Sequence, residues 1–89
     1  MLKTDVQRRV ENLVQSYPDG SGWRHWHGRI SHEVVIRSDV ADLQIIKEAY
    51  SEAATRLQEQ GFKASYFESL EHQDSDLAYY RIGVAIGRG

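Results

Sequence analysis

Residues 77–88 read Leu-Ala-Tyr-Tyr-Arg-Ile-Gly-Val-Ala-Ile-Gly-Arg, and two kinds of side chain alternate along them. The large apolar set is Tyr80, Ile82, Val84 and Ile86. The polar or small set is Tyr79, Arg81, Gly83, Ala85 and Gly87. Successive side chains of a strand point to opposite faces of its sheet. The stretch therefore predicts a strand with one buried face, and its length and apolar character place it in the centre of the sheet.

Two further strands are predicted upstream of this one. Residues 62–70 form one, and the polar loop 71–76 joins it to the last strand as a hairpin. Residues 29–37 form the other, because they alternate in the same way. The apolar-facing positions of this strand are Ile30, His32, Val34 and Ile36.

Helical periodicity marks two other segments. Residues 39–60 carry an apolar stripe at helical spacing; Ser38 and Asp39 supply an N-cap, and Gly61 ends the helix. An earlier helix follows from the spacing of Val6, Val10, Leu13, Val14 and Tyr17. Its start is predicted from a capping box of Thr4 and Gln7, and its end from Pro18-Asp19-Gly20.

These elements predict an α+β fold with the order α-β-α-β-β. A strand, a long helix and a second strand make a β-α-β unit, and the last strand fits between those two strands. The expected sheet has three strands in the spatial order first, third, second, a split β-α-β arrangement with both helices on one face. A simple meander is the alternative. The chain is expected to be a single domain over residues 1–89.

Composition limits the classes of protein that fit. The chain has 89 residues, 40% of them hydrophobic and 27% charged, as a folded domain requires. It has no cysteine, which excludes disulfides and fits a reducing compartment. The net charge of −2 lacks the basic excess of a duplex DNA binder. Its first twenty residues contain no unbroken apolar run, so a cytoplasmic protein without signal peptide or membrane span is expected.

One face of the predicted sheet has no helix to cover it. It is expected to present Val35, Arg37, Phe67, Tyr79, Arg81, Gly83 and Ala85. Glycine inside a strand often marks close approach by another backbone. The pattern therefore predicts a partner-binding surface with small residues at its centre.

The segment 19–28 is aromatic and irregular. Trp23 and Trp26, with Arg24 and Arg29, are residue types that stack on bases and contact phosphates of single-stranded nucleic acid. The competing interpretation is that at least one tryptophan caps the core. His25 and His27 have the spacing of a metal pair, but zinc needs three or four ligands and the sequence fixes no third, so no metal site is predicted.

The sequence therefore favours a non-enzymatic interaction or accessory module. It would self-associate, as a dimer, or dock on a larger protein through the open sheet face and the aromatic loop. The edge of strand 29–37 offers a second route to pairing. The alternative is a nucleic-acid-binding accessory protein that uses Trp23, Arg24, Trp26 and Arg29. No catalytic spacing and no cofactor motif is found, so no cofactor and no membrane partner is expected.

Overall fold

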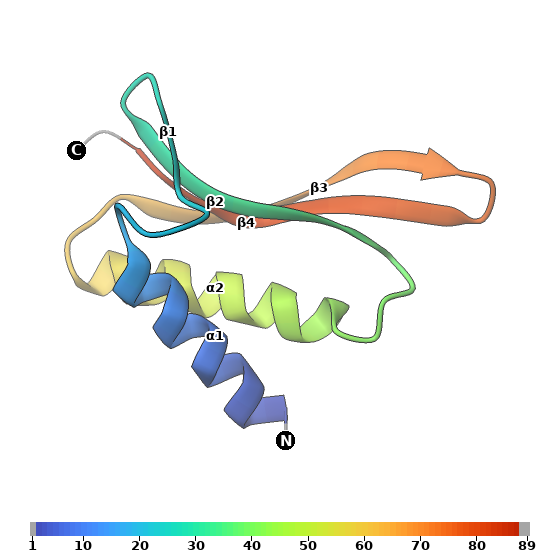
Figure 1. The fold of residues 1–89 in the computed structure, drawn as a ribbon, viewed down its shortest axis with the longest axis horizontal. Coiled ribbons are helices and arrows are strands. Elements are labelled where there is room, and N and C mark those ends of the chain that lie inside the picture. Colours follow the sequence, from blue (N-terminus) through green and yellow to red (C-terminus); the bar gives the residue numbers. More distant parts are fainter. Residues whose placement is uncertain (1, 88–89) are drawn as a thin grey trace.

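The computed structural model describes residues 2–87, and the side chains of residues 5–87. It contains two helices and one antiparallel sheet of four strands in the order β1-β2-β4-β3 (Figure 1). In chain order the elements are α1 (Leu2–Ser16), β1 (Arg24–Trp26), β2 (Arg29–Arg37), α2 (Leu43–Glu59), β3 (Ala64–Asp74) and β4 (Leu77–Ile86). The class is therefore α+β, with the order α-β-β-α-β-β.

The position of β4 in the sheet is the one that its alternating sequence predicts. β4 pairs antiparallel with both β2 and β3, so these two outer strands run parallel to each other on either side of it. The predicted split β-α-β order is confirmed for these three strands, and the meander is wrong. Ile82 and Val84 on β4 are fully buried, as the centre of the sheet requires.

The prediction of three strands misses β1. Trp26 pairs with Arg29, and the two residues between them, His27 and Gly28, have φ angles of 48° and 80°. Positive φ at both central residues is the conformation of a tight hairpin turn whose twist matches the flanking strands. Part of the segment expected to be irregular is therefore a hairpin. β1 occupies the outer edge of β2 at residues 29–31, so the expected edge strand 29–37 is only partly an edge.

Both helices lie on the same side of the sheet (Figure 1). α2 packs on β3 and β4, while α1 packs mainly against α2. Neither helix within residues 2–87 combines the length and apolar character needed to span a bilayer. The core lies between α2 and the sheet and continues into the α1–α2 contact. Its fully buried side chains include Val10, Ala53 and Leu57 from the helices.

The helix starts differ from the predicted ones, whereas the end of α2 is confirmed. α2 begins at Leu43 and not at residue 39, because Asp39 is paired with Arg37 and the Ser38 hydroxyl accepts the Ala78 N–H. Thr4 lies inside α1, so the predicted capping box is wrong. At the end of α2 the N–H of Phe62 donates to the Leu57 carbonyl at 3.1 Å across Gly61, which has φ +97°. This is the left-handed helix stop expected of glycine.

The β3–β4 hairpin is longer than predicted. Its strands continue to Asp74 and Leu77 and leave Ser75 and Asp76 as the turn, in place of the predicted loop 71–76. A bulge lies between Leu70 and His72. The hairpin extends well beyond the helices (Figure 1). The first predicted residues of β3, 62 and 63, precede the strand, and residue 88 lies outside the described residues.

Candidate functional site

The register of the sheet brings most of the predicted contact residues onto one face. Residues paired across neighbouring strands point to the same side of a sheet. The pairs Trp26–Arg29, Val35–Arg81 and Phe67–Gly83 therefore share the face that no helix covers. By the same register this open face, as we call it, carries Arg24, Trp26, Arg29, Val35, Arg37, Phe67, Tyr79, Arg81, Gly83 and Ala85. Arg24 and Trp26 lie on β1, the strand that the sequence did not predict.

The centre of the open face is not the exposed stripe that was expected. Ala85 is only 4% exposed and Gly83 is buried, although no helix lies over them. A Cβ built on Gly83 would overlap the carbonyl oxygen of His32 and lie 2.8 Å from Glu33 Cβ. The glycine does mark a close backbone approach, but the approaching backbone is β2 of the same chain. These two residues therefore offer almost no area to a partner.

The exposed apolar surface of this face lies around that centre. Trp26 is 72% exposed on β1, and Val35 is 48% exposed on β2. Phe67 and Tyr79 are half-buried, and the Tyr79 ring lies 5.9 Å from that of His72. A partner would thus contact large side chains at the rim rather than small ones in the middle.

The arginines of the open face fall into two groups. Arg81 donates two hydrogen bonds to Glu71, at 2.5 and 2.9 Å, and a third to Glu33, so two carboxylates surround one guanidinium. Arg37 is paired with Asp39 at 2.7 Å, and its hydrogen bonds hold the pKa of that carboxyl below its usual range. Within the described side chains 5–87, neither Arg24 nor Arg29 is in an ion pair, and both are exposed.

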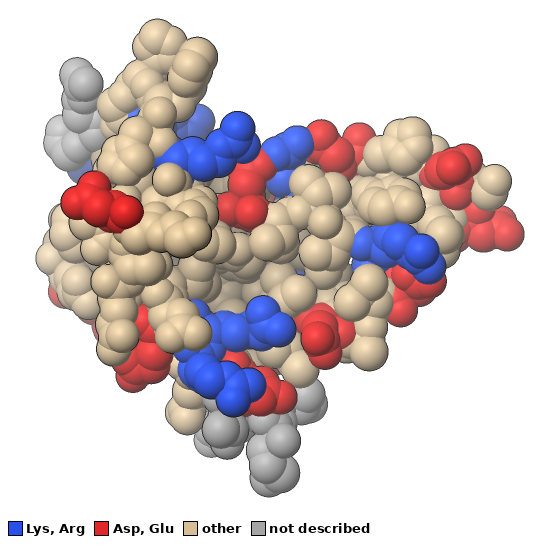
Figure 2. All heavy atoms as spheres, in the orientation of Figure 1, with Lys and Arg blue, Asp and Glu red and all other residues tan. Residues whose placement is uncertain are grey.

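The two ends of the molecule consequently differ in charge. Arg24 and Arg29 lie on the β1–β2 hairpin, where β4 also ends. Glu71, Asp74 and Asp76 lie at the far end of the β3–β4 hairpin and are exposed. Acidic side chains gather at that projecting end in Figure 2, and Arg81 is the base that pairs with one of them. The open face therefore runs from a basic end to an acidic end.

Trp23 is not part of this face. It is 8% exposed, its Nε1 donates to the Ser16 hydroxyl at 2.7 Å, and its ring meets Tyr17 and His32 edge-on at 5.1 and 5.2 Å. The interpretation of one tryptophan as a cap on the core is confirmed for Trp23. It cannot stack on a base without leaving the core, so that part of the nucleic-acid interpretation is wrong.

The two histidines of the aromatic loop do not converge. His25 donates from Nε2 to the Pro18 carbonyl at 2.9 Å on the helix side of the sheet, whereas His27 lies in the hairpin turn. Within the described residues no group of three or more His, Asp or Glu side chains is placed to hold a metal ion.

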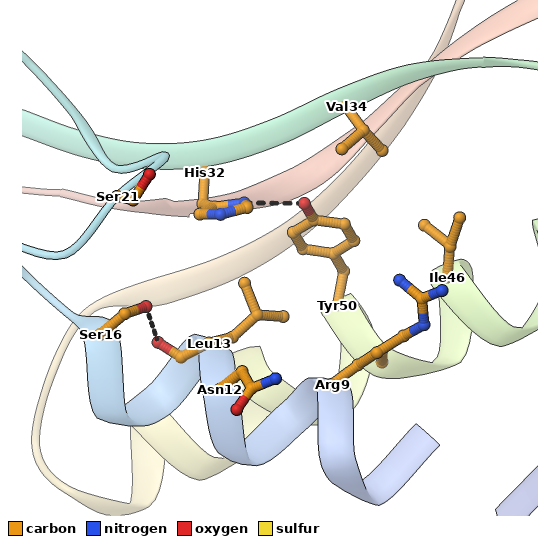
Figure 3. A pocket seen from close by; sticks show the side chains of 10 residues that line it. Arg9, Asn12, Leu13, Ser16, Ser21, His32, Val34, Ile46 and Tyr50 are labelled. Atoms are coloured by element: carbon orange, nitrogen blue, oxygen red, sulfur yellow. Dashed lines mark hydrogen bonds between the residues drawn. The ribbon is translucent and has the colours of Figure 1, made fainter. Parts of the chain in front are cut away.

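On the helix side the structure shows a cleft that the sequence did not indicate. It has a volume of about 350 Å³ and lies between α1, α2 and β2 (Figure 3). Its apolar walls are Leu13, Val34, Ile46 and Ala49. Its polar groups come from Arg9, Asn12, Ser16, Ser21, His32 and Tyr50. It forms because α1 packs on α2 and leaves the inner side of β2 without a helix directly over it.

The electrostatics of the cleft are dominated by a single charge. The Tyr50 hydroxyl and His32 Nδ1 form a 2.7 Å hydrogen bond across it. Burial lowers the pKa of His32 and raises the pKa of Tyr50 to about 12, so both rings are neutral near pH 7. Among the described residues that line the cleft, none is a carboxylate and only Arg9 is formally charged; its ion-pair partner Asp42, 3.9 Å away, is not part of the lining.

The sequence contained only part of the signal for this cleft. His32 and Tyr50 fall on the predicted apolar faces of their elements, and two polar rings on apolar faces are a sign that they could contact each other.

The chain matches no protein-family model, no curated protein and no solved structure, so its own geometry is the basis for any functional conclusion.

Proposed function

We propose that this protein is a non-enzymatic interaction module that forms a homodimer through the open face of its sheet. The observation that carries the proposal is the charge layout of that face. Exposed apolar side chains, Trp26 and Val35, lie on a face with a basic end at Arg24 and Arg29 and an acidic end at the β3–β4 hairpin. If a second copy is rotated by 180°, its basic end faces the acidic end of the first copy, so the surface is complementary to itself.

The geometry of the pair follows from symmetry. In a two-fold dimer the same patch is used by both subunits, and each contact occurs twice. If the open faces meet with their strands antiparallel, Arg24 and Arg29 of one copy lie over Asp74 and Asp76 of the other. Charge complementarity of this kind sets orientation and register more than it adds affinity. The affinity would come from burying Trp26, Val35 and the half-buried Phe67.

The test is the oligomeric state in solution, measured by sedimentation or light scattering over a range of protein concentration. Val35→Asp places a carboxylate in the proposed contact and is expected to give a monomer. Val40→Asp is the matched control, because Val40 is also an exposed valine, at 41%, but lies in the segment between β2 and α2. A wild type that stays monomeric at high concentration would refute self-association and leave docking on a different protein.

A charge exchange tests the orientation. Arg29→Glu alone is expected to weaken the dimer, because it places two acidic groups opposite each other. Adding Asp76→Arg to the same chain restores opposite charges in both halves of a two-fold pair and is expected to recover association. If the double variant is as weak as Arg29→Glu, the antiparallel arrangement is wrong even where a dimer exists.

Binding of single-stranded nucleic acid is the second candidate function. It is favoured by Trp26, which is exposed between Arg24 and Arg29, two arginines without ion pairs among residues 5–87. Stacking on one aromatic ring with flanking phosphate contacts is a feature of single-strand binders. A salt-dependent quench of tryptophan fluorescence by oligonucleotides, lost in Trp26→Phe, would support it. No quench in wild type would exclude it.

A further inference from the structure

The cleft between α1, α2 and β2 lies on the opposite side of the sheet from the proposed dimer surface and needs a separate explanation. We infer that it binds a small organic carboxylate with an apolar body, whose carboxylate is held by Arg9. The two sites share no residue, so this inference stands or falls independently of the dimer.

The size and walls of the cleft fit a small molecule. Its volume of about 350 Å³ is near the lower end of the roughly 300–1,000 Å³ of small-molecule sites. Leu13, Val34, Ile46 and Ala49 give it apolar walls from three different elements. An apolar ligand body would replace water against these walls, which is the main source of affinity in sites of this kind.

The charge of the ligand follows from Arg9. Within the described side chains Arg9 makes no hydrogen bond, and its ion pair with Asp42 is a loose one, at 3.9 Å between side chains that are 45% and 57% exposed. Figure 3 shows the Arg9 side chain reaching from α1 along the wall formed by Tyr50 and Ile46. The positive charge of Arg9 opposes the rise that burial causes in the Tyr50 pKa. A guanidinium that lines an apolar cleft and whose ion-pair partner is not hydrogen-bonded to it still has donors for a carboxylate, which accepts two parallel hydrogen bonds from it.

The other polar groups of the cleft limit the ligand further. The His32 imidazole and the Tyr50 hydroxyl already satisfy one another at 2.7 Å. A Cβ on Gly22 would lie 2.5 Å from His32 Nε2, so the loop backbone closes over that edge of the ring. Neither ring is free to bind a cation, and the described residues that line the cleft include no carboxylate that would attract one. The remaining donors, Asn12 and Ser21, are neutral and fit a neutral polar substituent at most.

The experiment uses three probes of nearly the same shape with the 89-residue chain: phenylacetate, neutral phenylacetamide and cationic phenethylamine. Binding is followed in two-dimensional amide NMR spectra. Phenylacetate is expected to shift amides of the cleft residues saturably and to bind about tenfold more tightly than phenylacetamide, the gain of one partly exposed charge-assisted interaction. Phenethylamine is expected to bind most weakly.

Two variants at consecutive positions of α1 make the test specific. Arg9→Met keeps an unbranched apolar stem but removes the charged guanidinium, and it is expected to lower phenylacetate affinity about tenfold and to leave phenylacetamide affinity unchanged. Arg8→Met is the control, because Arg8 points out of the cleft and pairs with Asp5 at 2.9 Å. Circular dichroism checks that both variants fold like wild type.

Three results would overturn the inference. The first is equal affinity for the three probes, and the second is a loss in Arg9→Met that is the same for acid and amide. The third is the absence of saturable shifts at the cleft residues with any probe. Amide shifts that occur only on the open face also overturn the inference, because they would place the binding site on the other side of the sheet.

Discussion

Replacing Gly83 with alanine tests whether that glycine serves the fold or a partner. A Cβ at this position would overlap the His32 carbonyl oxygen and lie within 2.8–2.9 Å of Glu33 Cβ and Cα. These are mainly backbone atoms, so β2 and β4 would have to separate at the centre of the sheet. Inserting a methyl group into a packed site of this kind destabilises by about 1–3 kcal/mol.

An opposing effect must be subtracted from that loss. Alanine has fewer unfolded conformations than glycine, which stabilises by about 0.4–1 kcal/mol where the native backbone accepts it. Taken from the middle of these two ranges, the net loss expected for Gly83→Ala is about 1–2 kcal/mol, out of roughly 4–13 kcal/mol for a domain of 89 residues. At about 4–8 °C per kcal/mol, Tm falls by roughly 4–16 °C and the protein still folds.

Gly87→Ala is the matched control. Among the described residues no atom lies within 4 Å of a Cβ built at Gly87, so this variant keeps the gain in the unfolded state and lacks the clash. The assay is thermal and urea unfolding followed by circular dichroism, at low and high protein concentration. If the two variants melt within about 2 °C of each other, the clash argument is refuted. If Gly83→Ala keeps its stability but loses association, Gly83 belongs to a partner contact.

Three other substitutions test the core, the tryptophans and the buried histidine. Val84→Asp places a carboxylate at a fully buried position and is expected to prevent folding, seen as loss of the circular dichroism signal. Trp23→Phe removes the hydrogen bond to Ser16 and part of a buried ring, so it is expected to destabilise by about 1–3 kcal/mol in urea unfolding, whereas Trp26→Phe changes stability by less than about 0.5 kcal/mol. The pKa of His32 in the folded state lies below its ordinary value of 6.5. As pH falls below 6.5, His32 binds a proton in the unfolded chain before it does so in the folded chain. The stability that neutral His32 contributes is therefore complete above pH 6.5 and is lost as pH falls from there toward the folded-state pKa. His32→Gln is expected to flatten the loss of stability between about pH 7 and 5, and an unchanged pH dependence would show that another group causes it.

The periodic segments of this chain were predictable because their patterns are long. The alternation of large apolar with polar or small residues from Tyr80 to Ile86 determines the face of β4, and a glycine after an apolar stripe determines where α2 ends. The starts of the helices were not predictable from capping residues alone. Asp39 has the side chain of an N-cap, but a bidentate interaction with Arg37 two residues earlier takes it away from the helix.

β1 was missed because three residues are too few to show a period. Its turn is also an unusual one, since histidine and not asparagine precedes the glycine. Histidine is one of the few residues with a side chain that enters the left-handed region readily, which is why His27 and Gly28 can form the turn. The unusual composition of residues 19–28 was evident from the sequence, but the hairpin was not; His25 lies in its first strand and His27 in its turn.

The central glycine shows why a sequence pattern can identify a feature and leave its cause open. A glycine in a strand indicates that a backbone comes close, but it does not say to which molecule that backbone belongs. Here β2 approaches, and its Glu33 then bonds to Arg81, which lies two residues before Gly83 on β4. The close approach and the ion pair are thus parts of one contact that fills the middle of the open face. A partner is left with the rim, where Trp26 and Val35 are exposed. For this reason Val35→Asp is expected to break association, whereas Gly83→Ala is expected to weaken the fold.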